Sequence, residues 1–262
     1  MPKIITEDMI EQAAIKALHE RHDYTVLNCM TEEPDTLPDG TGRKDKKQVV
    51  LPDVMLESLC RINPDIPEQT VRTVVDELCH TPVSGDLMLT NYQNYQKIRN
   101  GITVEYIKDG KKTSNIFRLL SYNDALSNTF TVASQMWISG ETHWRRPDLI
   151  IFINGFPLVF IELKNSNIPV KNAYDINLKN YLKDIPYLFN YNQICVLSNG
   201  METRLGSFAA GYEFFFEWLK VENEKENPDR KAIRENCTSL EYFIAGLCEP
   251  KNLLDYIENF IL

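Results

Sequence analysis

Two short apolar runs stand near the middle of the chain, at residues 149–153 and 158–163, and Asn154-Gly155 lies between them. An Asn-Gly pair between two apolar runs is a strong short-range signal of a β-hairpin. The pattern therefore predicts two antiparallel strands in a buried sheet.

Helical and strand-like periods divide the rest of the chain. A first helix is expected at 6–22, because Thr6 is a suitable N-cap, Glu7 and Asp8 suit the first turn, and apolar side chains recur at helical spacing. Further helices are expected at about 53–62, 67–79, 84–98, 171–185, 238–247 and 251–261, and strands at about 102–106, 129–138, 193–197 and 202–205. Residues 28–50 and 222–235 are polar or charged without a period, and they indicate exposed segments.

This order of elements predicts an α/β (α+β) protein with a mixed β-sheet flanked by helices. We expect three parts: a mainly helical N-terminal part at 1–100 that packs on the core, the core itself at 101–220, and C-terminal helices at 221–262.

Charged side chains stand at the ends of the predicted hairpin. Asp148 opens the first strand, and Glu162 and Lys164 close the second. Such charges are seldom buried without a partner or a metal ion. Two carboxylates can hold Mg²⁺, and an ammonium group beside them can orient water or stabilise developing charge. Hydrolysis of phosphodiester bonds suits this trio, although an acid-x-Lys triplet in isolation is more often a solvated strand end.

The register of the hairpin gives a sharper test. With a plain two-residue turn, Asp148 would face Ile161, and Glu162 would lie on the opposite face of the sheet. The two acids can share a metal ion only if the pairing has an odd offset, from a three-residue loop at 154–156 that Pro157 would end or from a β-bulge near Asp148. We predict such an irregularity.

Composition narrows the class of protein. The 262 residues suffice for a sizeable core, no apolar stretch is long enough to span a membrane, and the N-terminus lacks the apolar core of a signal peptide. Six scattered cysteines without zinc spacing indicate reduced thiols in a cytoplasmic protein. The net charge of −9 argues against a general DNA-coating protein but does not exclude local contact with DNA. The sequence has no phosphate-binding loop of the Gly-x-x-x-x-Gly-Lys-Ser/Thr type, so we expect no motor in this chain.

Four polar residues outside the trio each allow a structural and a functional interpretation. Glu11, by its position alone, is a solvated glutamate beside the buried stripe of the first helix. His143 could act as a base or a ligand, but a single histidine is usually structural, and we leave it outside the site. Asn177 and Tyr181 are four residues apart on one helix face, where they could contact a DNA phosphate or form a half-buried packing surface.

The hairpin sequence Arg-Pro-Asp-Leu-Ile-Ile-Phe-Ile-Asn-Gly-Phe-Pro-Leu-Val-Phe-Ile-Glu-Leu-Lys resembles a known motif. It is similar to the PD-(D/E)xK nuclease motif in the N-terminal domain of the restriction (R, HsdR) subunit of type I restriction-modification enzymes. The likeness extends to residues 11–14, 63–67, 184–193, 198–207 and 253–262, the last of which resemble the approach to the family's helicase domains. The resemblance implies a PD-(D/E)xK restriction-endonuclease-like core at 101–220 with an N-terminal helical extension.

The resemblance also implies roles at the metal site. Asp148 and Glu162 would coordinate Mg²⁺, with the backbone carbonyl of Leu163 as a further ligand. Lys164 would position the attacking water. Glu11 corresponds to an acid that the family places near the metal.

For DNA contact, the resemblance points to the helix after Lys164. The family's Gln-x-x-x-Tyr motif assists DNA contact and cleavage, and here Asn177 to Tyr181 match it with the shorter Asn in place of Gln. Arg145 and Arg146 are further candidates for contact with the DNA backbone.

The implied activity is the cutting of double-stranded DNA after ATP-driven translocation, in a complex with modification (M) and specificity (S) subunits. ATP would be used by helicase motor domains that this chain lacks, so we expect the chain alone to cut weakly or not at all. Two alternatives stay open: a PD-(D/E)xK nuclease of the repair or resolvase type, which the long flanking match disfavours, and a non-catalytic docking module, against which the intact acid pair and lysine argue.

Overall fold

A six-stranded mixed sheet forms the centre of the computed structural model, which describes residues 5–80, 85–221 and 238–261. The strand order is β1 (Thr25–Asn28), β4 (Phe130–Ser134), β7 (Leu149–Ile153), β8 (Phe156–Leu163), β9 (Ile194–Ser198), β10 (Thr203–Gly206). β1 runs parallel to β4 and β9 runs parallel to β8, whereas the other neighbours are antiparallel. The predicted mixed sheet flanked by helices is confirmed, and the architecture is compatible with a PD-(D/E)xK-like nuclease fold.

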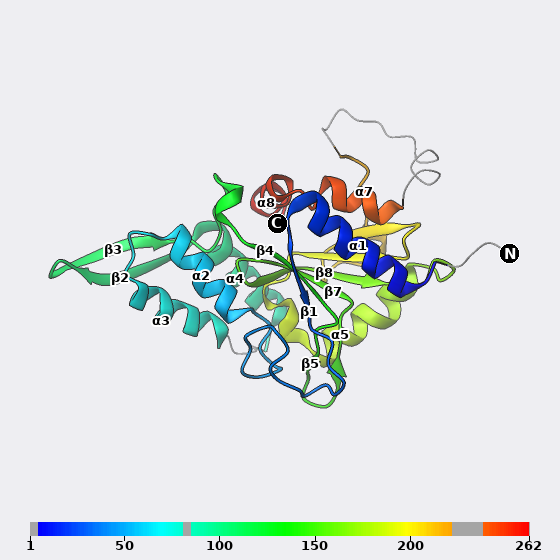
Figure 1. Ribbon diagram of the computed structural model, residues 1–262, viewed down its shortest axis with the longest axis horizontal. Helices are drawn as coiled ribbons and strands as arrows, with labels where there is room; N and C mark the ends of the chain where they lie inside the picture. Colours follow the sequence, from blue (N-terminus) through cyan, green and yellow to red (C-terminus); the bar gives the residue numbers. More distant parts are fainter. Residues whose placement is uncertain (1–4, 81–84, 222–237, 262) are drawn as a thin grey trace.

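Helices cover both faces of this sheet (Figure 1). One face packs against α1 (Glu7–His22), α7 (Ser239–Gly246) and α8 (Pro250–Asn259), and the other packs against the π-helical turn η2 (Ala173–Leu178), α5 (Lys179–Asp184) and the 3₁₀ turn η3 (Pro186–Asn190). Because neighbouring residues of a strand point to opposite faces, Ile151 belongs to the first core, and Ile150 and Phe152 belong to the second. This burial on both faces explains why β7 is apolar at every position and β8 at every position except Glu162.

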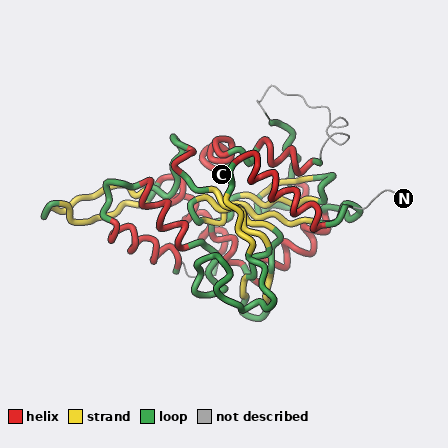
Figure 2. The backbone as a smooth tube through the Cα atoms, viewed as in Figure 1, coloured by secondary structure: helices red, strands yellow, loops and turns green. Residues whose placement is uncertain are grey.

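A helical lobe and a long hairpin extend from one side of the sheet (Figure 2). They comprise α2 (Pro52–Ile62), α3 (Glu68–Cys79), α4 (Leu87–Asn100), β2 (Ile102–Lys108) and β3 (Lys111–Phe117). The remaining short elements are η1 (Ala125–Ser127), β5 (Ile138–Ser139), β6 (Trp144–Arg145) and η4 (Tyr212–Phe214). Buried residues of α2, α3 and β2 join the same hydrophobic cluster as α1 and α8, so this lobe shares a core with the sheet.

The structure confirms a helix or strand wherever the periods predict one, with ends that differ by a few residues. Thr6 caps α1 as expected, because its side chain accepts a hydrogen bond from the backbone N–H of Met9. The expected strand at 129–138 is divided into β4 and β5, and Gln135 between them has a φ of 54°. β1 was not predicted, because its four residues are mostly exposed and too few to show a pattern. The charged segment at 222–235 lies outside the described residues.

Three charged side chains of the segment before α2 are buried, although residues 28–50 were expected to be exposed. Asp39 accepts hydrogen bonds from Arg43 at 2.6 Å and from Lys46 at 2.7 Å, and all three side chains are almost fully shielded from solvent. Arg43 also donates to the backbone carbonyl of Trp137 at 3.1 Å. The prediction of an exposed loop is therefore wrong for this trio, which ties the segment to the chain just before β5.

The β7–β8 hairpin contains the predicted irregularity. Asn154 and Gly155 have φ values of 50° and 83°, as a tight two-residue hairpin turn requires. The pairing then shifts by one residue at Leu158, the extra residue of a β-bulge, and the shift brings Asp148 opposite Glu162. The irregularity is thus a bulge within β8 and not a three-residue loop.

Candidate active site

The bulge brings Asp148, Glu162 and Lys164 together. Oδ2 of Asp148 accepts a hydrogen bond from the backbone N–H of Leu163 at 2.7 Å, which fixes the carboxylate beside β8. Oε1 of Glu162 accepts a hydrogen bond from Nζ of Lys164 at 2.9 Å. The two acids are buried, with exposed fractions of 7% for Asp148 and 2% for Glu162. Residues 14 positions apart in the sequence thus form one compact polar site in an apolar sheet.

Burial dominates the electrostatics of this trio. It raises the pKa of Asp148 to about 6, and it raises the pKa of Glu162 as well, where the charge of Asp148 adds to the effect. For Lys164, burial lowers the pKa, but the negative charges of Glu162 and Glu7 outweigh burial and hold the pKa above its ordinary value. Two buried carboxylates beside one ammonium group are costly to ionise, and a further positive charge would relieve that cost.

The oxygen atoms at the site suit a hard divalent cation. Oε2 of Glu162 is buried and has no hydrogen-bond partner in the described part of the chain. Oε1 of Glu162 and the backbone carbonyl of Leu163 both accept from the ammonium group of Lys164. Carboxylate and carbonyl oxygens are the ligands that Mg²⁺ prefers, and a buried carboxylate oxygen without a partner is available for one. Over residues 5–80, 85–221 and 238–261, no cluster of three or more His, Cys, Asp or Glu side chains could hold a metal ion. The available donor set is therefore two carboxylates and one carbonyl.

A hollow of about 480 Å³ adjoins Asp148 and contains Glu11 in its wall. Glu11 is only 5% exposed, so its interpretation as a solvated glutamate is wrong. Its carboxylate accepts a hydrogen bond from the side-chain amide of Gln135, whose backbone N–H donates to the carbonyl of Asp148 at 3.0 Å. Burial, with a smaller contribution from the charge of Asp148, raises the pKa of Glu11 to about 7. The structure thus places Glu11 and Asp148 around one hollow.

Gln135 is a residue of this site that the sequence did not indicate. It follows β4 with a positive φ, which is uncommon outside glycine and which ends the regular strand. No charge, motif or spacing marks it in the sequence. Its importance follows only from the pairing of β4 with β7, which places it beside Asp148.

Tyr181 on α5 lies beside the acid pair. Its hydroxyl donates to the backbone carbonyl of Arg146 at 3.1 Å, and its ring packs edge-on against Phe160. Burial and the charges of Glu162 and Asp148 raise its pKa well above the ordinary value, so the hydroxyl stays protonated. Tyr181 is therefore a neutral donor that anchors α5 to the chain before β7.

The other residues predicted to contact DNA lie around this site. Asn177 is half-buried on η2, a π-helical turn of a kind often found at functional sites, and within the described residues it has no hydrogen bond to either acid. The guanidinium of Arg146 lies 4.9 Å from the ring centre of Trp137, and Arg146 lines the hollow beside Asp148. Arg145 donates from Nε to Asp184 at 2.7 Å, at the end of α5.

Comparison with known proteins gives one family. The sequence model of the type I restriction enzyme R protein N terminus (HSDR_N) matches residues 4–236. The type I restriction enzyme HindI endonuclease subunit of Haemophilus influenzae is 34% identical over 227 residues, which cover 84% of this chain and 21% of that protein. The EcoprrI endonuclease subunit of Escherichia coli is 31% identical over 174 residues, which cover 63% of this chain and 51% of that protein. The SauCOLORF180P endonuclease subunit of Staphylococcus aureus is 40% identical over 150 residues, which cover 55% of this chain and 15% of that protein.

The chain thus corresponds to a part of each of these relatives, from 15% of the SauCOLORF180P subunit to 51% of the EcoprrI subunit. Among the described helices, none has the length and apolarity that a membrane span requires.

Proposed function

The chain belongs to the family of type I restriction enzyme R protein N termini, and on that premise we propose that it is the DNA-cutting domain of such an enzyme. The proposed reaction is the hydrolysis of phosphodiester bonds in double-stranded DNA. One observation carries the proposal: the bulge in β8 turns Asp148 and Glu162 to the same face beside Lys164, with a buried oxygen of Glu162 left without a partner.

The donor set fits Mg²⁺, which Asp148, Glu162 and the carbonyl of Leu163 would hold. When bound, the ion would polarise a phosphoryl oxygen and lower the pKa of a water molecule. Lys164 stays protonated because of its raised pKa, so its ammonium group can donate a hydrogen bond to the attacking water and stabilise negative charge on the phosphate. Glu11, which accepts a hydrogen bond from Gln135, would add a further oxygen on the side of Asp148.

DNA contact is assigned to the rim of the site. Arg146 lines the hollow beside Asp148, and Asn177 and Arg145 lie on neighbouring elements, where their side chains would bind phosphates. Tyr181 would act by fixing α5 against the chain that carries Arg146. Such contacts position the DNA backbone and carry no sequence information, so the choice of site would belong to another subunit.

The remaining parts of the activity belong to the larger assembly. We assign ATP-driven translocation to helicase motor domains outside this chain, and modification and DNA specificity to M and S subunits. The described cysteines are all unpaired, which supports a reducing compartment such as the cytoplasm.

Titration of the 262-residue chain with Mg²⁺ or Mn²⁺, with calorimetry as the readout, tests the metal site. We expect saturable binding that Asp148→Ala abolishes and that Asp184→Ala leaves intact, because Asp184 pairs with Arg145 and does not belong to the proposed metal site. Absence of binding in the wild-type chain would favour a docking module over a nuclease.

The assembled restriction enzyme tests the division of labour. In that complex, Lys164→Ala should keep ATP hydrolysis and lower DNA cleavage by a factor on the order of 100 or more. Cleavage at the wild-type rate would exclude Lys164 from the chemistry, and loss of both activities would show that the lysine serves the fold or the assembly.

A further inference from the structure

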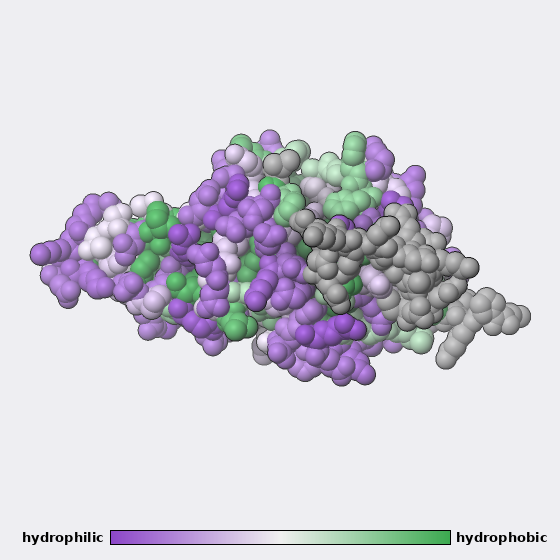
Figure 3. Space-filling view, turned by 90° about the horizontal axis from the view of Figure 1, so that it is seen from above, coloured by the Kyte–Doolittle hydropathy of each residue, from purple (hydrophilic) through white to green (hydrophobic). Residues whose placement is uncertain are grey.

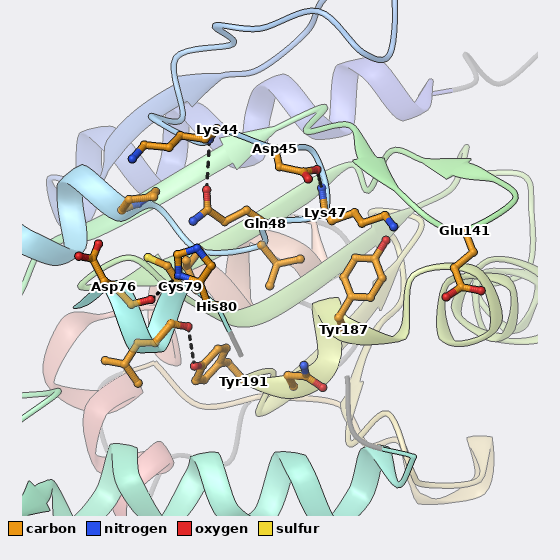
Figure 4. Close-up of a pocket in the computed structure, with 15 residues that line it drawn as sticks. Lys44, Asp45, Lys47, Gln48, Asp76, Cys79, His80, Glu141, Tyr187 and Tyr191 are labelled. Atoms are coloured by element: carbon orange, nitrogen blue, oxygen red, sulfur yellow. Dashed lines mark hydrogen bonds between the residues drawn. The ribbon is translucent and has the colours of Figure 1, made fainter. Parts of the chain in front are cut away.

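A second hollow, of about 440 Å³, lies between the segment that leads into α2, the end of α3 and the turn η3 (Figure 4). No residue of the proposed nuclease site lines it. Its inner wall is apolar and aromatic, with Val49, Val50 and Leu78 beside the rings of Tyr187 and Tyr191. Its size is within the range of pockets that bind small molecules.

Two residues that line this hollow each have a buried polar atom without a partner among the described residues. The hydroxyl of Tyr187 and Oδ1 of Asn190 make no hydrogen bond to any described residue, although their residues are only 9% and 2% exposed. Tyr191, in the same wall, has the hydrogen-bond partner that a buried hydroxyl usually has, because its hydroxyl donates to the carbonyl of Leu78 at 3.1 Å. Buried polar atoms nearly always have a partner, so two such atoms around one hollow indicate that something else supplies their hydrogen bonds.

The donors and acceptors restrict the chemistry of that ligand. Oδ1 of Asn190 only accepts, so the ligand must donate a hydrogen bond there, whereas the hydroxyl of Tyr187 can donate or accept. Figure 4 shows the Tyr187 ring pointing toward the segment with Asp45 and Lys47. A ligand that carries a donor and an acceptor along one edge satisfies both atoms.

The rim and the walls restrict it further. Charged side chains of both signs surround the opening, namely Lys44, Lys47, Asp45, Asp76 and Glu141. Because these charges nearly cancel, the hollow favours a ligand without a large net charge. Aromatic rings and aliphatic side chains on the inner wall suit a flat ring, since bases stack on aromatic side chains with little regard to their identity.

We propose that this hollow binds a nucleobase, either in a free nucleoside or as an unpaired base of a nucleic acid strand. Its ring would lie against the tyrosine wall, a ring or exocyclic N–H would donate to Oδ1 of Asn190, and the hydroxyl of Tyr187 would bond an adjacent acceptor. Side-chain amides are the groups that read such paired donors and acceptors on base edges.

Titration of the 262-residue chain with adenosine, guanosine, cytidine and thymidine, followed by NMR chemical shifts, tests the proposal. We expect saturable binding of at least one nucleoside with a Kd of about 1 mM or tighter. A second arm uses a single-stranded oligonucleotide of the preferred base. Tighter binding of the oligonucleotide would identify a strand as the source of the base, and tighter binding of the nucleoside would identify the free molecule.

Variants separate binding in the hollow from binding elsewhere. Tyr187→Phe and Asn190→Leu each remove one unpartnered atom, and each should weaken binding by about tenfold without lowering the melting temperature. Tyr106→Phe is the matched control, because the Tyr106 hydroxyl already accepts from Asn115 on the distant β2–β3 hairpin. Absence of saturable binding by every nucleoside and the oligonucleotide would overturn the proposal, and so would unchanged binding in both Tyr187→Phe and Asn190→Leu.

Discussion

The carboxyl group of Asp148 titrates differently in the folded and the unfolded chain. Its ordinary pKa is 3.8, and burial in the fold raises it to about 6. The folded chain therefore holds this proton more tightly than the unfolded chain does. The contribution of Asp148 to the free energy of unfolding is fully present below about pH 4 and is lost as the pH rises through about 6. At neutral pH the ionised carboxylate destabilises the fold unless a cation is bound nearby.

Asp148→Asn tests this linkage through stability. Without a divalent ion, we expect the variant to be more stable than wild type near pH 8 by on the order of 3 kcal/mol, and equally stable near pH 4. Mg²⁺ should raise the melting temperature of the wild-type chain and leave the variant unchanged. Thermal unfolding followed by circular dichroism measures both effects, and a variant that is less stable than wild type near pH 8 would contradict the account.

Gln135 gives a second prediction at the scale of single residues. Gln135→Leu keeps the size of the side chain but removes the donor that holds Glu11, so we expect metal affinity to fall by about tenfold in calorimetry. Gln12→Leu is the matched control, because Gln12 lines the same hollow as Glu11. Equal affinities in the two variants would remove Glu11 from the metal site.

The turn of the hairpin β7–β8 is the element that must keep its shape. Gly155 has a φ of 83°, and a Cβ atom there would lie 2.6 Å from the backbone oxygen of Leu51. Gly110, in the turn of the β2–β3 hairpin, has a φ of 75° with nothing within 4 Å of such an atom. The two glycines share a backbone conformation and differ in their surroundings.

Alanine at these two glycines separates the effects. Gly110→Ala should cost about 1 kcal/mol from backbone strain alone, and Gly155→Ala should cost about 3 kcal/mol because the contact with Leu51 is added. Urea denaturation gives both free energies of unfolding. If the two variants lost the same free energy of unfolding, the segment with Leu51 would move aside at no energetic cost, and it would not hold the turn in place.

The sequence predicted the existence of the hairpin irregularity but not its position. The requirement that Asp148 and Glu162 share a face demands an offset somewhere between them. Its place at Leu158 depends on two successive side chains, Leu158 and Val159, packing into the same core, which only the assembled sheet determines. The π-helical turn that carries Asn177 likewise cannot be recognised from the sequence alone.

Burial of polar groups was the other feature that local patterns missed. Asp39, Arg43 and Lys46 form a charged stretch in the sequence that suggests solvent exposure, yet Asp39 pairs with both bases inside the fold. Glu11 and Gln135 come from elements 124 residues apart, so only tertiary structure makes them partners. Periodicity predicts which apolar side chains are buried, but it does not show which polar side chains are buried with them.

For the whole molecule, the net charge of −9 opposes the binding of DNA. Figure 3 shows hydrophilic residues over much of one face, including the tip of the projecting arm that β2 and β3 form. At the proposed site, Arg146 and Lys164 supply positive charge. Under the proposed function, we therefore expect the binding of a DNA duplex to need help from other parts of a restriction complex.

A gel-shift titration of the 262-residue chain with a short DNA duplex checks this. At physiological salt, we expect a Kd weaker than about 1 μM and a further loss of affinity as salt is added. Nanomolar binding by the chain alone would show that its own surface suffices, and the partner subunits would then not be needed for DNA capture.

The bulge at Leu158 also limits how this hairpin can change during evolution. Removing or adding one residue between Asp148 and Glu162 would turn one acid to the far side of the sheet, unless a second change in the same hairpin restored the parity of the count. Lengthening the turn by a pair of residues would leave both acids facing the same way. Insertions and deletions between the two acids are therefore expected to comprise even numbers of residues. This restriction acts on the number of residues in the hairpin and not on the identity of any one side chain.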